Sequence, residues 1–117
     1  MNLQNLTILR DTLLNLPPEV HLDMDNGRMP HPCGTAACIA GVCHIINNPG
    51  PTLHTYSFPW PMVQEVALEW LGLPARVKFT NAMAHPLFDF TLAPADCTPQ
   101  QAAQAVQNVM DNQSPWN

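Results

Sequence analysis

The residues best suited to chemistry lie between positions 31 and 44. They are three cysteines and two histidines: His31, Cys33, Cys38, Cys43 and His44. Zinc needs three or four nitrogen or sulfur ligands that converge on the metal. Two cysteines five residues apart on one helix diverge by about 140°, and the usual C-x2-4-C spacing of paired ligands is absent. We therefore expect buried thiols and no metal, with His31, Cys33 and Cys38 as the runner-up ligand set.

A disulfide between Cys33 and Cys38 is a second use of these sulfurs. If Thr35 caps a helix, Cys38 falls in its first turn, where a helix N-terminus lowers the pKa of a thiol. Cys33 then lies just before the cap, and the two sulfurs come within disulfide range. The alternative to free thiols is therefore a regulatory or structural disulfide between these two cysteines.

Thiol catalysis is a third use, with Cys33 as the nucleophile and a histidine as the base. Three histidines are candidates for that base, but no motif sets the geometry of a pair: His21, His31 and His54. The chain also lacks a phosphate-binding loop, G-x-S-x-G and H-E-x-x-H. We predict no catalytic residue, no cofactor and no enzymatic activity.

Two acidic motifs are candidates for metal binding or acid chemistry. Residues 23–27 resemble the start of a calcium loop, but the glycine comes one residue early and Gly34 occupies the closing position, where a Glu is needed. Glu65 and Glu69 are four residues apart, on one face of a helix. We expect that face to be solvated.

The cysteine cluster depends on a central helix that we predict over residues 36–47, with Thr35 as its N-cap. Only His44 is clearly polar in the run 36–46. A helix that is apolar on all sides belongs inside a protein, and this run is too short for a bilayer, which needs about 20 residues. The residues Asn47 and Asn48, followed by proline and glycine, end it.

An N-terminal helix is predicted over residues 3–16, with Asn2 as its cap. Its leucines repeat at steps of three and four, which marks one buried face: Leu6, Leu9, Leu13 and Leu16, extended by Leu3 and widened by Ile8 and Leu14. Residues 19–25 alternate between apolar and polar and predict a half-buried extended arm. Because Pro30 and Pro32 argue against a partner strand, we expect an arm and not a sheet.

Two further helices are predicted in the second half of the chain. One begins at Pro61 and ends at Gly72, which reads as a left-handed terminator with Leu73 folded back on Leu68. Its predicted buried stripe is Val63, Val66, Ala67 and Trp70. The last helix follows Thr98, with Gln101 completing a capping box. Its predicted inner face is Ala102, Val106, Val109 and Met110, and Trp116 is expected to dock the tail.

The segments between these helices give weaker signals. Residues 53–58 have some strand character, residues 75–84 predict a weak helix, and residues 87–92 form a short turn or an extended piece. The whole chain predicts one mainly all-α domain over residues 1–117. It is a compact bundle of four to five short helices around the central apolar helix (36–47), with the arm (19–25) and long Pro-rich loops.

Composition limits the possible partners of this 117-residue chain. Charged residues make up only 11%, and the net charge is −5 with four Lys and Arg. Nucleic-acid affinity comes largely from basic contacts to phosphate, so we expect no direct nucleic-acid binding. No N-terminal basic flank precedes a long apolar run, so we expect no signal peptide, no membrane association and a cytoplasmic location. An acidic protein can dock on a basic protein surface.

Several short segments together resemble a known family. They are LPPE (16–19), Asp23-Met24, CGTAACIAG (33–41), EWLGL (69–73) and TPQQAA (98–103). They are similar to a family of small uncharacterised bacterial and phage proteins with the motif C-G-T-x-x-C-I-A-G. Where that family often has an aromatic residue or His after the last Gly of the motif, this chain has Val42. The resemblance implies a prokaryotic or viral cytoplasmic protein and implies no activity.

Our first functional hypothesis is a small acidic, non-enzymatic interaction protein. If it is encoded by a phage or mobile element, it inhibits a host defence complex, such as a CRISPR effector, through protein–protein contacts. Acidic residues would meet a basic groove and aromatic residues would anchor the contact: Asp23, Asp25, Glu65 and Glu69 with Tyr56 and Trp60. The alternative is a thiol- or zinc-dependent protein that uses Cys33 and Cys38. A third hypothesis is a homo-oligomer that contacts itself through the Gln-rich face of the last helix.

Overall fold

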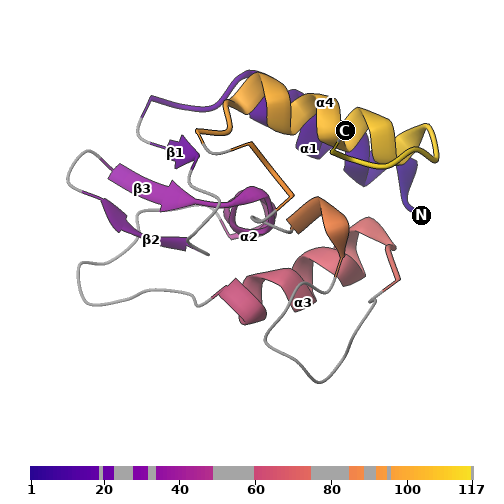
Figure 1. The fold of residues 1–117 in the computed structure, drawn as a ribbon. Coiled ribbons are helices and arrows are strands. Elements are labelled where there is room, and N and C mark those ends of the chain that lie inside the picture. Colours follow the sequence, from indigo (N-terminus) through magenta and orange to yellow (C-terminus); the bar gives the residue numbers. More distant parts are fainter. Residues whose placement is uncertain are drawn as a thin grey trace.

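The chain folds around four helices and a small sheet. The computed structural model describes residues 1–18, 20–22, 28–31, 34–48, 60–74, 85–88, 92–94 and 96–116. Along these residues the element order is α1, β1, β2, β3, α2, α3, the 3-10 turn η1 and α4. Helices α1 and α4 lie side by side, α3 lies on the opposite side, and α2 lies between them (Figure 1). The mainly helical class expected from the sequence is confirmed.

Helices α1 (Leu3–Leu14) and α4 (Pro99–Met110) form an antiparallel pair. The α1 leucines at steps of three and four are fully buried, as predicted: Leu6, Leu9 and Leu13. On the pair's rim, the Arg10 guanidinium donates to Gln107 Oε1 at 2.7 Å, and the Thr7 hydroxyl contacts Met110 Sδ at 3.6 Å. The predicted Asn2 cap is confirmed, because its Oδ1 accepts from the Asn5 N–H at 3.0 Å.

The start of α4 follows from local side chains. Thr98 Oγ1 accepts from the Gln101 N–H at 3.1 Å, and Gln101 Oε1 accepts from the Thr98 N–H at 2.9 Å. This reciprocal pair is the predicted capping box, and Pro99 occupies the first helical position. The inner face is buried as expected at Ala102, Val106 and Val109.

The central helix begins later than predicted. Helix α2 spans Ile39–Asn47, and its N-cap is Cys38, so the predicted Thr35 cap is wrong. Residues Gly34–Ala37 instead form strand β3. A run of small apolar residues suits a buried strand as well as a buried helix, and here two other strands supply backbone partners. The end of α2 is as predicted, since Asn47 Nδ2 and Asn48 Nδ2 donate to carbonyls one turn back.

The predicted lone arm is also wrong, because it is part of a sheet. Strand β1 (Val20–Leu22) pairs in parallel with β3, and β2 (Arg28–His31) pairs with β3 in antiparallel fashion. The order β1-β3-β2 places β2 at an edge. An edge strand tolerates Pro30, because the lost N–H is not needed on the outer side. The sheet lies beside α2 (Figure 1).

Helix α3 (Trp60–Leu71) ends as the sequence predicts. Gly72 has φ +66°, the Leu73 N–H donates to Leu68 O at 3.0 Å, and the Gly72 N–H donates to Glu69 O at 3.2 Å. Leu68 and Leu73 are both buried. These bonds form a Schellman ending, with the accompanying apolar contact.

The predicted apolar stripes were too wide. The periodic pattern marks helix faces but does not show which faces have a neighbour to cover them. Four large apolar side chains that we assigned to the core are exposed: Leu3, Ile8, Leu14 and Val66. On α3, Gln64 is buried instead, and Trp70 is only half-buried.

Some predictions fall on residues that the structure does not describe. These are the strand character at 53–58, the weak helix at 75–84, most of the arm beyond Leu22, and the side chain of Val63. Turn η1 (Pro86–Phe88) lies where a short turn was one of two options, and its Leu87 and Phe88 are fully buried. The tail docks as expected, because Trp116 Nε1 donates to Pro86 O at 2.9 Å.

Candidate functional site

The cysteines of α2 are part of the core. Cys38 and Cys43 have no solvent exposure, and His44 is buried beside them on α2. Cys38 Sγ accepts from the Gly41 N–H at 3.4 Å, so this sulfur acts as the cap of α2 and does not lie in its first turn as predicted. Burial, and then the neighbouring Cys38, raise the pKa of the Cys43 thiol well above its usual 9.0. A thiol held in its neutral form is a poor nucleophile and a poor metal ligand.

The other members of the cysteine cluster are only partly placed. The backbone of His31 pairs with Gly34 across β2 and β3, and Cys33 lies outside the described residues. The Cys33–Cys38 disulfide and the His31, Cys33, Cys38 metal set therefore stay predictions. Among the described residues, no three His, Cys, Asp or Glu side chains gather in a way that could hold a metal ion.

Two of the six predicted partner-binding residues have described side chains. Glu65 and Glu69 are both exposed on α3, and Val66 is exposed between them, with 39% of its surface accessible. Together Glu65, Val66 and Glu69 are called the α3 face below. The α3 face combines two carboxylates with an apolar side chain, and the half-buried Trp70 lies one turn beyond Val66. Trp60 begins α3, whereas Asp23, Asp25 and Tyr56 lie outside the described residues.

The end of α3 is tied to the N-terminal segment. The Asn2 N–H donates to Leu71 O at 2.8 Å, and Asn5 Nδ2 donates to Trp70 O at 2.8 Å. With the two bonds of the Schellman ending, each of the last four carbonyls of α3 has a partner. A Cβ on Gly72 would lie 3.1 Å from the Asn2 nitrogen, so the two segments are in close contact. The position of α3 is thereby defined relative to α1.

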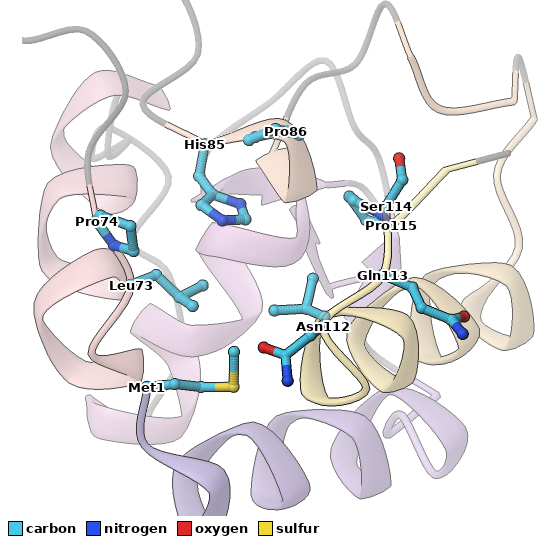
Figure 2. Close-up of a pocket in the computed structure, with 10 residues that line it drawn as sticks. Met1, Leu73, Pro74, His85, Pro86, Asn112, Gln113, Ser114 and Pro115 are labelled. Carbon is cyan, nitrogen blue, oxygen red and sulfur yellow. The ribbon is translucent and has the colours of Figure 1, made fainter.

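A hollow of about 400 Å³ opens just beyond this junction. Figure 2 shows it between the end of α3, the end of α4, turn η1 and the N-terminal residue. The Met1 side chain, Leu73 and the His85 ring all reach toward it, and the Asn112 amide faces it from the end of α4. Its floor includes Leu73 and Val109, which are themselves part of the buried core. None of the described residues that line it is Asp, Glu, Lys or Arg.

The walls of the hollow are positioned by short-range bonds. Asn112 has φ +58° and follows α4 in a second Schellman ending, in which the Gln113 N–H donates to Asn108 O at 2.8 Å. His85 Nδ1 accepts from the Leu87 N–H at 3.1 Å, and its ring lies 6.3 Å from the buried Phe88 ring. The accepted bond places the proton of the neutral imidazole on Nε2. The hollow is therefore preformed by four segments of the chain: the N-terminal residue, the end of α3, the start of η1 and the end of α4.

Sequence reasoning identified the α3 acids but missed the hollow. Part of its wall was readable, because the left-handed Gly72 and the packed Leu73 were both predicted. Asn112 carries a weaker signal, since Asn is the residue after Gly that most readily adopts the left-handed conformation. No local sequence pattern shows that Leu73, His85 and Asn112 lie together, because they are far apart in the sequence.

Comparisons with known proteins identify no relative of this chain. No family model matches the chain, and neither a curated protein nor a solved structure does. The resemblance carried by the C-G-T-x-x-C-I-A-G motif thus stays a prediction. Within the described part of the chain, no helix combines the length and apolar character needed to cross a bilayer.

Proposed function

We propose that this protein binds another protein through the α3 face and the hollow at the end of α3, and that it is not an enzyme. One observation carries the proposal: Glu65, Val66 and Glu69 are exposed together on α3, and a preformed hollow begins at Leu73, four residues after Glu69. An apolar centre with a charged rim is the usual anatomy of a protein interface.

The charges support a basic partner. The chain carries a net charge of −5, and two carboxylates of the α3 face are exposed. Complementary charge mainly raises the association rate and selects the partner, and salt weakens it. The half-buried Arg10 is no competitor for these acids, because its guanidinium pairs with Asp11 at 2.9 Å on α1, which lies on the other side of the molecule from α3.

The hollow supplies the anchor in this proposal. Its volume of about 400 Å³ suits one or two apolar side chains of a partner, with Leu73 and Val109 at the floor. The exposed Asn112 would then hydrogen-bond the partner backbone at the rim. Interfaces commonly concentrate affinity in one such pocket.

The resemblance suggests a specific biological form of this activity. A phage or mobile-element protein of this kind would inhibit a host defence complex, such as a CRISPR effector, by occupying a basic groove that normally holds nucleic acid. Inhibition of a defence complex would require that a phage or mobile element encodes the chain. Nucleic-acid-binding defence complexes are therefore the first class of partner to test.

The test is protein capture from a bacterial lysate with three tagged proteins, followed by mass spectrometry. The first is the native chain, the second carries Glu65→Lys with Glu69→Lys, and the control carries Asp11→Lys with Asp96→Lys. The control makes the same change in net charge at exposed acids away from α3. We expect the native chain and the control to retain the same proteins, with loss from the α3 variant and at high salt.

A fourth protein tests the anchor. Ser114 is exposed at the rim of the hollow, so Ser114→Trp adds bulk there and removes the hydrogen bond from its hydroxyl to Trp116 O at 3.2 Å. We expect it to retain less of the same partner. Equal capture by all four proteins, or no salt-sensitive partner at all, would contradict the proposal.

A further inference from the structure

A second hollow lies along the outer side of α4, away from the α3 face. It measures about 450 Å³ and lies between residues 92–94, the exposed side of α4 and the docked tail. Its apolar wall is made of Leu92, Pro94, Ala105, Pro115 and Trp116, and its polar groups come from Gln101, Gln104 and Asn108. We call it the α4 groove.

Apart from the indole of Trp116, the polar side chains among the described residues that line the α4 groove are carboxamides. Gln104 Nε2 donates to Asn108 Oδ1 at 3.0 Å, and Asn108 Nδ2 donates to Pro115 O at 3.1 Å. These bonds orient the two amides and leave the Gln104 Oε1 and the remaining N–H groups for a ligand. None of the described residues that line the groove is charged. The groove therefore suits a neutral ligand whose groups both donate and accept hydrogen bonds.

Trp116 narrows the choice of ligand. Its single donor, Nε1–H, is used by Pro86 O at 2.9 Å, and this bond holds the half-buried indole in place. The indole therefore offers a ligand only ring carbon atoms and the electron-rich ring surface. Leu92 is 53% exposed on the same groove and adds a second apolar contact.

We propose that the α4 groove binds a neutral oligosaccharide. A pyranose ring has C–H groups that pack on an aromatic surface, and its hydroxyl groups donate and accept as carboxamides do. A proline-rich peptide fits less well, because proline has no N–H to donate to the carboxamide oxygens and the indole N–H is in use. A nucleotide can stack its base on the indole as well, but its phosphates are opposed by a net charge of −5.

The test is a titration of the nitrogen-15-labelled protein followed by NMR. The probes are cellotetraose, maltotetraose and chitotetraose, with octaproline as the peptide comparison. The signals are the Trp116 indole N–H, assigned with Trp116→Phe, and the side-chain amides of Gln104 and Asn108. We expect at least one saccharide to shift these signals saturably at millimolar concentration, and octaproline to leave them unchanged.

Two variants of exposed glutamines on α4 make the test specific. Gln104→Ala removes a groove amide, and because Ala favours helix the fold is kept. We expect it to weaken saccharide binding by about tenfold, the loss of one well-placed hydrogen-bonding group. Gln100→Ala, on the same helix but outside the groove, should bind as the native chain does. The proposal is overturned if no saccharide shifts these signals, if octaproline shifts them, or if Gln104→Ala binds unchanged.

Discussion

Helices α2 and α4 begin in opposite surroundings. The first turn of α4 is exposed at Gln100 and Gln101, and its start depends on two bonds between Thr98 and Gln101. The first turn of α2 is fully buried at Ile39 and Ala40, and its cap is a weak sulfur acceptor on Cys38. Where a helix end faces water, water or nearby side chains can satisfy its N–H groups, and a side-chain cap fixes the starting residue locally. Where it is enclosed, packing selects the starting residue.

The largest expected contrast is between two alanine substitutions in these first turns. Ile39→Ala should lower the free energy of unfolding by about 2 to 5 kcal/mol, because it leaves a cavity in the core. Gln100→Ala should change it by less than about 0.5 kcal/mol. Urea unfolding of both variants measures the difference. Equal losses would mean that the first turn of α2 is not enclosed.

A smaller contrast compares the two threonines that precede helical sequence. Thr98→Val removes the cap of α4 and should cost about 0.5 to 2 kcal/mol. Thr35→Val should cost less than about 0.5 kcal/mol, because a β-branched residue is retained in strand β3. The measurement is again urea unfolding. A loss at Thr35 as large as that at Thr98 would favour a helix start at residue 35.

Alkaline pH should lower the stability of the protein through the buried thiol of Cys43 on α2. Burial raises the pKa of this thiol, so the native state keeps a proton that the unfolded chain loses above about pH 9. Where the unfolded state binds fewer protons, the free energy of unfolding falls as pH rises. We expect unfolding midpoints to decrease above pH 9 and to decrease less steeply in Cys43→Ala. Parallel curves for the two proteins would contradict this assignment.

The last comparison does not concern stability. It measures how accessible the thiols of Cys97 and Cys43 are to a reagent. Cys97 precedes the α4 cap and is half-buried, and burial raises the pKa of its thiol. Cys43 is fully enclosed. Iodoacetamide should therefore modify Cys97 before Cys43, and Cys43 only when the protein unfolds. Peptide mass spectrometry over time gives the order, and early modification of Cys43 would indicate an opening of α2.

The same contrast explains which predictions succeeded. The helices with polar ends were found with their caps, at Asn2, Thr98 and the Gly72 ending, because each signal lies within a few residues. The strand β3 was missed, since its pairing partners at Val20–Leu22 and Arg28–His31 are distant and Pro30 argued against one of them. The exposed acids Glu65 and Glu69 were found from their spacing. The hollow beyond the end of α3 was not, because its wall joins residues from four segments.

By itself the sequence determined the helical class, the start of α1, the end of α3, the start of α4, and an acidic composition with four Lys and Arg, on which the proposal of a protein partner rests. These follow from periodicity, capping chemistry and charge, all of which act locally or through composition. Only the tertiary structure decided where α2 begins, which apolar side chains remain exposed, and how Leu73, His85 and Asn112 meet. Small apolar residues permit strand and helix alike, and the choice belongs to whichever neighbours bury them and complete their backbone hydrogen bonds.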